Sequence, residues 1–219
     1  MIEVYGLSIN QLNPDLLNAE NTDWMKRFSA YRMEKIIRCK NEKAKKQGIA
    51  AGYLLDYVLS LHGLREKTAV FHTNSYGKRL LSDADVNLSH SGNYVLCAYG
   101  DRPVGIDIER IRPDMEKIAK RFFTEAEYEW ILQQEKKEEA FVRLWTLKES
   151  YVKQIGTGLN TPLNQFEIKL WPEIGVCEVG KERKRDCYFK EYVKEDYRIA
   201  VCACDNVFPK EIIFLTEID

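Results

Sequence analysis

The stretch Val104-Gly105-Ile106-Asp107-Ile108-Glu109 alternates between apolar residues and polar or small ones. In an extended strand, residues two apart share a face, so the apolar residues at 104, 106 and 108 are expected to point into a core. Asp107 and Glu109 are then expected to point together into open space, and Gly105, on the same face, leaves room for a ligand. Magnesium is usually held by one or two carboxylates together with phosphate and water. This strand therefore predicts half of a site for a metal-bound phosphate.

A second stretch, Trp145-Thr146-Leu147-Lys148-Glu149-Ser150-Tyr151-Val152-Lys153, has helical spacing. Within a predicted helix over residues 138–154, a step of four places Glu149 and Lys153 on one face. A carboxylate there can complete a metal shell or accept a proton, and an ammonium one turn further can neutralise a phosphate oxygen. Taken alone, the two residues equally fit an ordinary surface pair, which contributes about 0.2–0.5 kcal/mol.

Further motifs surround these two stretches. Asn87-Leu88-Ser89-His90-Ser91-Gly92 and Tyr76-Gly77-Lys78 precede the strand, and Arg121-Phe122-Phe123-Thr124-Glu125-Ala126-Glu127-Tyr128 lies between the strand and the helix. In this order, over roughly residues 30 to 165, the motifs resemble those of the Sfp-type 4′-phosphopantetheinyl transferases, including Val-Gly-Ile-Asp-Ile-Glu followed by Trp-x-x-Lys-Glu-x-x-x-Lys. Chance agreement at this many ordered points is improbable.

The resemblance implies a fold. Members of this family are pseudo-dimers of two similar α+β halves with the active site between them, and the expected halves are residues 1–102 and 103–219. The Ser89-His90 motif is expected on a loop. Because two fused halves complete the site within one chain, a monomer is expected. Periodicity predicts strands at 2–9, 68–72, 94–99, from 104 and within 166–214, and helices at 23–46, 49–61, 115–121, 125–134 and 138–154.

The resemblance also implies a reaction, in which the 4′-phosphopantetheine arm of coenzyme A is transferred to a serine of a carrier protein and adenosine 3′,5′-bisphosphate is released. Asp107, Glu109 and Glu149 are then the ligands of Mg²⁺, which bridges the pyrophosphate. Mn²⁺ shares the same hard-oxygen chemistry and could substitute. Glu149 is also the candidate base for the serine proton, and Lys153 is expected to contact coenzyme A and stabilise charge on its pyrophosphate.

Coenzyme A carries an additional 3′-phosphate, which needs cations and hydrogen-bond donors away from the metal. The resemblance assigns the nucleotide contacts to Ser89 and His90 and to the basic residues Arg32, Lys35 and Lys78. For the two residues at 32 and 35, solvated surface charge is the competing interpretation.

Two departures from the family pattern concern this nucleotide site. Gln47-Gly48 stands where many relatives have Arg-Ser or Arg-Thr, so a guanidinium and a hydroxyl are missing, and Lys45 or Lys46 is a candidate to compensate. Arg79 replaces the proline that often follows Tyr-Gly-Lys, which alters the loop without removing its positive charge. Neither departure touches the metal residues, so the type of reaction is expected to be unchanged.

The expected partner is an apo carrier protein of the acyl, peptidyl or aryl type. Carrier proteins are typically acidic around the modified serine, which favours a basic or apolar patch near the metal. The segment with Lys117, Lys120, Arg121, Phe122 and Phe123 fits, since a charged rim around aromatic anchors suits a transient interface. The alternative is that both phenylalanines belong to the core. The sequence leaves open whether the carrier serves fatty-acid, polyketide, nonribosomal-peptide or siderophore synthesis.

Composition argues against several other classes. The chain has 33 basic and 34 acidic residues and a net charge of −1, so bulk charge gives no support for nucleic-acid binding. No apolar run reaches the length of a membrane span, and the first residues lack the pattern of a signal peptide, so no membrane contact and a cytoplasmic location are expected. The six cysteines show no paired zinc-site spacing and are expected to be free thiols.

Two alternatives from other classes remain. A different Mg²⁺-dependent phosphoesterase or nucleotide-binding enzyme would also use Asp107 and Glu109, and would act on coenzyme A or a nucleotide without any carrier protein. A noncatalytic carrier-binding module would need no complete metal set, so the presence of Glu149 and Lys153 counts against it.

Overall fold

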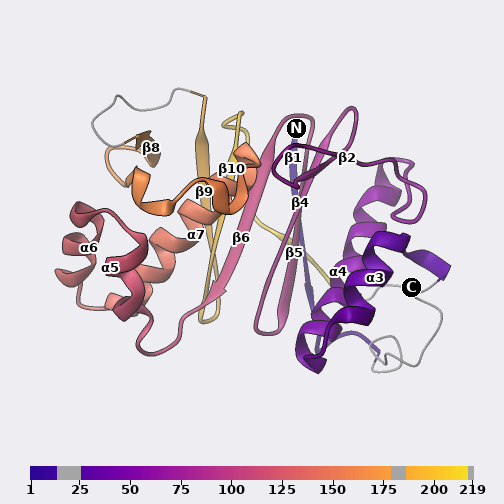
Figure 1. The fold of residues 1–219 in the computed structure, drawn as a ribbon, viewed down its shortest axis with the longest axis horizontal. Coiled ribbons are helices and arrows are strands. Elements are labelled where there is room, and N and C mark those ends of the chain that lie inside the picture. Colours follow the sequence, from indigo (N-terminus) through magenta and orange to yellow (C-terminus); the bar gives the residue numbers. More distant parts are fainter. Residues whose placement is uncertain (14–25, 179–185, 217–219) are drawn as a thin grey trace.

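Two β-sheets occupy the centre of the structure, and helices cover their outer sides (Figure 1). The computed structural model describes residues 1–13, 26–178 and 186–216. The first sheet has the order β11-β1-β5-β4 and consists of β1 Ile2–Ser8, β4 Asp85–Ser91, β5 Tyr94–Gly100 and β11 Ile213–Leu215. The second has the order β6-β10-β9 and consists of β6 Val104–Arg110, β9 Tyr188–Lys194 and β10 Tyr197–Ala203. The predicted α+β class is confirmed.

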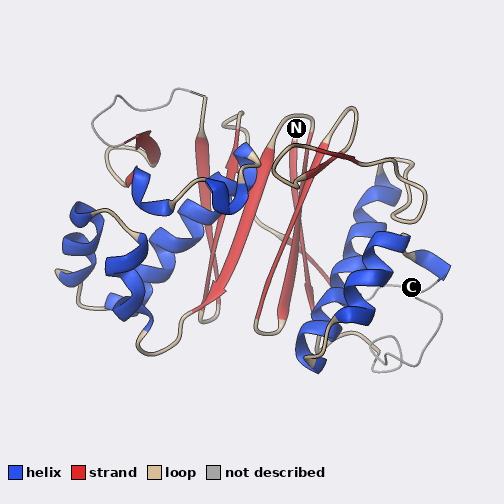
Figure 2. Ribbon diagram, in the orientation of Figure 1, coloured by secondary structure: helices blue, strands red, loops and turns tan. Residues whose placement is uncertain are grey.

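The helices gather in two groups, one on each outer side of the sheets, as Figure 2 shows. Beside the first sheet lie α3 Ala30–Arg38 and α4 Glu42–Leu61. Beside the second lie η1 Met115–Ile118, α5 Ala119–Phe122, α6 Glu125–Leu132 and α7 Lys137–Ile155. Short elements complete the described fold: the hairpins β2 His72–Thr73 with β3 Arg79–Leu80 and β7 Phe166–Lys169 with β8 Gly175–Glu178, and the 3₁₀ turns η2 Gly158–Asn160 and η3 Leu163–Gln165.

Three apolar clusters hold these layers together. One lies between α4 and the first sheet, and a second packs α7 on the second sheet. The third lies between the two sheets and contains Val104, Ile106 and Ile108, all fully buried. The predicted alternation of the strand at 104–109 is therefore confirmed, and its apolar face joins the two sheets.

Side chains also join the neighbouring edges of the sheets, β4 and β6. Alternate residues of β4 accept hydrogen bonds from alternate backbone N–H groups of β6, at 2.9–3.3 Å, because residues two apart on a strand share a face. This side-chain ladder satisfies buried backbone donors that would otherwise cost stability. Its pairs are Asp85 with Val104, Asn87 with Ile106, Ser89 with Ile108, and Ser91 with Arg110.

Some predicted elements differ from those observed. The Ser89-His90 motif lies inside β4 and not on a loop, because its alternate side chains are needed in the ladder to β6. The strand predicted at 68–72 is limited to β2, and the helix predicted at 115–121 is a 3₁₀ turn followed by a single α-helical turn. The helix at 49–61 begins earlier, at Glu42, where the Asn41 side chain caps it. Of the elements predicted at 23–46 and 166–214, residues 23–25 and 179–185 lie outside the described residues.

The C-terminal end of the described chain returns to the first sheet. Strand β11 pairs in parallel with β1, with Tyr5 opposite Ile213. The division into 1–102 and 103–219 and the pseudo-dimeric relation of the halves stay predictions. The structure does show two sheets, with the long helix α4 beside the first and α7 beside the second, and the first sheet includes β11 from the C-terminal end.

Candidate functional site

Asp107 is the centre of a polar cluster between the two sheets and α7. Its Oδ1 accepts hydrogen bonds from Lys153 Nζ at 2.6 Å and from Ser89 Oγ at 2.8 Å. Asp107 is 4% exposed, so the prediction that it points into open space is wrong, because α7 covers this part of β6. Lys153 also donates to Ser89 Oγ and to the Ile106 carbonyl, both at 3.1 Å. Three of the residues predicted to act together are thus in direct contact.

Glu109 and Glu149 lie close enough to Asp107 for their charges to interact. Burial and the charge of Asp107 raise the pKa of Glu109, and the same two causes, in the same order, raise the pKa of Glu149. The hydrogen bond that Ser91 donates at 2.7 Å and the charges of Arg112 and Lys153 lower the pKa of Glu109, and Lys153 lowers that of Glu149, but less than burial and Asp107 raise them. The protein alone therefore leaves an excess of negative charge at this point, which a bound cation would neutralise.

One oxygen of this carboxylate cluster also suits a metal ion. Asp107 Oδ2 is buried and has no hydrogen-bond partner in the structure. A buried carboxylate oxygen without a partner is costly, and a divalent cation would satisfy it. In the described part of the chain, no group of three His, Cys, Asp or Glu side chains is already gathered closely enough to hold a metal. The carboxylates fit a hard cation chemically, and they would have to draw together around it.

The sequence predicted that Gly105 leaves room for a ligand, and this prediction is wrong. A Cβ at this position would overlap the backbone of α7, at the carbonyl oxygen of Ser150 and the amide nitrogen of Gln154. The missing side chain therefore lets the helix backbone pack directly on β6. This close approach brings the α7 face with Glu149 and Lys153 onto the strand with Asp107.

Lys148, the lysine next to Glu149 in the helical motif, points to the opposite side from the cluster. It is fully buried and lies 2.8 Å from Glu127, and it donates to the carbonyls of Leu163 and Phe166, both at 2.6 Å. Glu127 in turn accepts hydrogen bonds from the backbone N–H of Thr124 at 3.0 Å and of Ile168 at 2.8 Å. The pair fastens α6 and the 163–168 segment to α7, so Lys148 supports the helix and does not face the site.

We expect Lys148→Met to lower the free energy of unfolding by about 3 kcal/mol, because Glu127 would stay buried without its cation. For a chain of this size, Tm should fall by roughly 6–12 °C. Thermal unfolding followed by circular dichroism measures this change. Lys137→Met, at the exposed start of the same helix, is the matched control and should leave Tm nearly unchanged. An equal Tm for Lys148→Met and wild type would contradict a structural role for the pair.

A pocket of about 500 Å³ lies between α3, α4 and the β2–β4 region, on the other side of β4 from the carboxylates. His90 lines it, whereas its neighbour Ser89 faces Asp107, because successive residues of a strand point to opposite sides. Burial and the charge of Lys153 lower the pKa of His90, so its ring is neutral at pH 7 and can still donate one hydrogen bond. The side chains of Ser89 and His90, which belong to one predicted motif, therefore point to opposite sides of β4.

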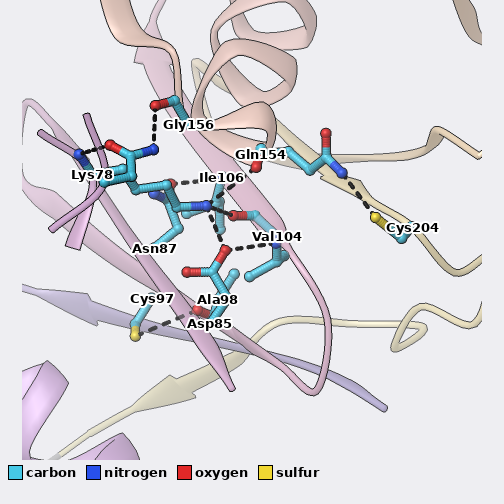
Figure 3. Close-up of polar contacts among 11 residues, drawn as sticks. Lys78, Asp85, Asn87, Cys97, Ala98, Val104, Ile106, Gln154, Gly156 and Cys204 are labelled. Atoms are coloured by element: carbon cyan, nitrogen blue, oxygen red, sulfur yellow. Dashed lines mark hydrogen bonds and ion pairs between the residues drawn. The ribbon is translucent and has the colours of Figure 1, made fainter. Parts of the chain in front are cut away.

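The predicted basic residues reach this pocket, but two of them are already paired. Arg32 Nε lies 3.0 Å from Glu66, whose side chain is fully buried. Lys78 forms an ion pair with Asp85 and donates to the carbonyls of Val104 at 3.1 Å and Gln154 at 3.3 Å (Figure 3). Lys78 thereby ties the predicted turn to β4, β6 and the end of α7. Lys35 and Arg79 also line the pocket.

The residues that depart from the family pattern occupy distinct positions. Gln47 is buried and donates to the Gly92 carbonyl at 2.9 Å, so it supports the β4–β5 turn. Gly48 lines the pocket, but neither Lys45 nor Lys46 does, and Lys45 pairs with Glu42 at 3.3 Å. The structure therefore gives no support to the idea that these two lysines compensate for the missing guanidinium.

The candidate docking segment is divided between surface and core. Lys117, Lys120 and Arg121 are exposed. Phe123 is 4% exposed and packs on Phe141 at 5.2 Å between ring centroids, so it belongs to the core. Phe122 is half-buried against Trp145. The exposed surface of this segment therefore consists of the basic side chains, of which Lys117 pairs with Asp114 at 2.6 Å, together with Ile118 and part of Phe122.

Comparison with known proteins agrees with the motifs. Residues 103–202 match the 4′-phosphopantetheinyl transferase superfamily. The chain is 35% identical over 222 residues to the 4′-phosphopantetheinyl transferase Sfp of Bacillus subtilis (strain 168), and 33% identical over 223 residues to the 4′-phosphopantetheinyl transferase ffp of Bacillus subtilis, with 98% of both chains covered in each case. A crystal structure of a holo-(acyl-carrier-protein) synthase from Bacillus anthracis in complex with CoA (3′,5′-ADP) is 18% identical, with a TM-score of 0.38, and the match covers 46% of this chain and 92% of that one.

The first two of these relatives match over nearly their whole length. The chain therefore belongs to the Sfp-type 4′-phosphopantetheinyl transferases.

Proposed function

We propose that this chain transfers the 4′-phosphopantetheine arm of coenzyme A to a serine of an acyl, peptidyl or aryl carrier protein, and so converts apo carrier to holo carrier. The observation that carries the proposal is the placement of Asp107, Glu149 and Lys153 in one cluster beside a nucleotide-sized pocket, in a chain of this family. Pockets for such ligands typically have volumes of about 300–1,000 Å³.

Asp107, Glu109 and Glu149 would hold Mg²⁺, with Mn²⁺ as the alternative ion. The partnerless Asp107 Oδ2 and the raised pKa values of the two glutamates support this donor set. When bound, the metal would neutralise charge on the pyrophosphate of coenzyme A. Burial raises these pKa values most and repulsion by Asp107 adds to it, and a bound cation would relieve that repulsion.

The chain's own residues would position the reacting groups. The serine oxygen of the carrier attacks the phosphorus next to the pantetheine, and the bond from that phosphorus to the bridging oxygen breaks, which releases adenosine 3′,5′-bisphosphate. Glu149 would accept the serine proton, since a carboxylate on the α7 face that carries Lys153 is positioned to act as a base. Lys153, fixed by Asp107 and Ser89, would stabilise charge on the leaving phosphate.

The carrier protein would dock near the carboxylate cluster through its acidic surface and would form a transient complex. Lys117, Lys120 and Arg121 are exposed and would supply the basic rim for it. The active site would be complete within one chain, so the enzyme would act as a monomer. Among the described residues, none of the helices is both long and apolar enough to cross a membrane.

The direct test is intact-mass spectrometry of a purified apo carrier protein after incubation with this protein, coenzyme A and Mg²⁺. We expect a gain of one phosphopantetheine on the carrier serine. Addition of EDTA should lower the rate by at least about 100-fold, because the metal contributes several kcal/mol to charge stabilisation, and excess Mg²⁺ should restore it. Cleavage of coenzyme A without modification of several carrier types would favour a phosphoesterase, and binding without chemistry would favour a carrier-binding module.

A further inference from the structure

Three of the six cysteines gather where β9, β10 and the end of α7 meet, and we call them the thiol cluster. Cys187 directly precedes β9, Cys202 lies within β10, and Cys204 directly follows β10. The sulfur atoms of Cys187 and Cys202 are 3.2 Å apart, and both side chains are buried in the apolar cluster between α7 and the second sheet. The proposed transfer reaction uses none of these thiols.

The register of β9 and β10 explains why the three thiols share one face. The ladder between these strands ends with Ala203 opposite Tyr188. Continued by one residue, it places Cys204 opposite Cys187. Cys202 is two residues from Cys204 and so points to the same side of its strand. Because opposite residues of an antiparallel pair have Cβ atoms about 4.5–5.5 Å apart, Cys187 can reach both thiols of the other strand.

The two buried sulfurs need little movement to form a covalent bond. A disulfide has an S–S distance of about 2.05 Å, so Cys187 and Cys202 would have to approach each other by about 1.2 Å from their separation of 3.2 Å. The backbone ladder begins only at Tyr188, so Cys187 can shift without breaking a ladder hydrogen bond. The fold therefore holds two thiols ready for a cross-strand bond.

The three thiols differ in their access to solvent, which sets the order in which they react. Burial raises the pKa of Cys202, and its hydrogen bond with Cys187 raises it further, so this thiol stays protonated at neutral pH. Peroxides react with an accessible thiol through its thiolate. Cys204 is partly exposed and lines a surface pocket, and its sulfur accepts a hydrogen bond from Gln154 Nε2 at 3.0 Å (Figure 3). A peroxide from solvent therefore meets Cys204 first.

We propose that the thiol cluster is a peroxide-sensitive modification site, in which Cys204 reacts first and a Cys187–Cys202 disulfide is the product. The proposal is independent of the transfer reaction. A disulfide is reversible by thiols, whereas oxidation of a cysteine beyond the sulfenic acid is not. The cluster thus converts exposure to peroxide into a reversible cross-link between β9 and β10.

The reaction balances with one molecule of hydrogen peroxide. The Cys204 sulfur attacks one peroxide oxygen, the O–O bond breaks, and a sulfenic acid and one water are formed. The Cys187 sulfur attacks the sulfenic sulfur, which gives a Cys187–Cys204 disulfide and a second water that takes up the thiol proton. The Cys202 sulfur then attacks Cys187, the first disulfide breaks, and Cys204 leaves as a thiol with the proton of Cys202. Two thiols have lost two electrons, and the peroxide has been reduced to two waters.

The test exposes the whole chain, fully reduced, to hydrogen peroxide and maps its disulfides by mass spectrometry after the free thiols have been alkylated. We expect a loss of two hydrogens, a single Cys187–Cys202 disulfide, and Cys204 recovered in alkylated form. Tm of the oxidised protein, measured without reductant, should rise by roughly 5–10 °C, because the cross-link constrains the unfolded chain. Dithiothreitol should reverse both changes.

Variants of each thiol separate the steps. Cys202→Ala should stop at the Cys187–Cys204 disulfide, and Cys187→Ala should form no disulfide and leave Cys204 as a sulfenic acid that dimedone traps. In Cys204→Ala, the Cys187–Cys202 disulfide should form at least about 10-fold more slowly, because only buried thiols remain in the cluster. Cys39→Ala, which removes the other partly exposed cysteine at the end of α3, is the matched control and should oxidise at the wild-type rate.

Oxidation of Cys204 beyond the sulfenic acid in the wild-type protein, with Cys187 and Cys202 still free, would overturn the proposal. Formation of the disulfide in Cys204→Ala at the wild-type rate would overturn the order of the steps. If Cys202→Ala lowers Tm of the reduced protein by more than about 5 °C, Cys187→Ala decides alone, and a disulfide between the two remaining thiols of that variant would contradict the role of Cys187.

Discussion

Glu149→Gln should lower the rate of carrier modification by at least about 10³-fold, because it removes a proposed metal ligand and the proposed base in a single change. The fold should survive. Burial and Asp107 raise the pKa of Glu149, so its charge is disfavoured in the folded protein at neutral pH, and an uncharged amide of the same shape relieves that repulsion. We therefore expect Tm of the metal-free variant to equal or slightly exceed that of wild type.

The measurement combines initial rates from intact-mass spectrometry with thermal unfolding of the same preparations. Glu138→Gln, on the first turn of the same helix, is the matched control and should retain full activity. A Glu149→Gln enzyme that modifies the carrier within about tenfold of the wild-type rate would remove Glu149 from both proposed roles. A loss of activity together with a collapsed Tm would instead show that the carboxylate is structural.

Gly105→Ala should have the largest effect on stability, a loss of at least about 4 kcal/mol in the free energy of unfolding. The added Cβ would overlap the backbone of α7 at Ser150 and Gln154 and would lie 3.0 Å from the carbonyl carbon of Lys153. Backbone cannot rotate away as a side chain can, so the helix must move off β6. Because α7 carries Glu149 and Lys153, carrier modification should also be lost in any protein that still folds.

Denaturant unfolding of Gly105→Ala beside Gly48→Ala tests this expectation. Gly48 lies inside α4, where an added Cβ would meet only Ile36 Cγ1 at 3.4 Å, and alanine there should stabilise the helix by up to about 1 kcal/mol. The same chemical change is thus expected to have opposite signs at the two positions. Equal stability of Gly105→Ala and wild type would mean that the close contact between α7 and β6 is not needed.

Several site residues could be predicted from the sequence because their spacing is local. The alternation in 104–109 and the step of four from Glu149 to Lys153 follow from strand and helix periods, and the structure brings Asp107 and Lys153 within 2.6 Å. The metal and nucleotide roles of these residues stay predictions until they are tested.

The partners of side chains that contact distant segments could not be predicted from the sequence. The sequence did not indicate that Lys78 pairs with Asp85 and Arg32 with Glu66. The alternation Asp85-x-Asn87-x-Ser89-x-Ser91 was visible and would have predicted a polar face on a strand, but its partner, the edge of β6, was not visible. Sequence spacing indicates which side chains share a face and gives no information on what covers that face.

The sequence by itself determined the family and the α+β class, because these depend on the types of residue and on short-range periods. Only the tertiary structure decided that Gly105 serves helix packing, that Ser89 and His90 face opposite sides of β4, and that Arg79 rather than Lys45 lines the pocket. The physical reason is that burial and charge neutralisation are set by neighbours far apart in the chain.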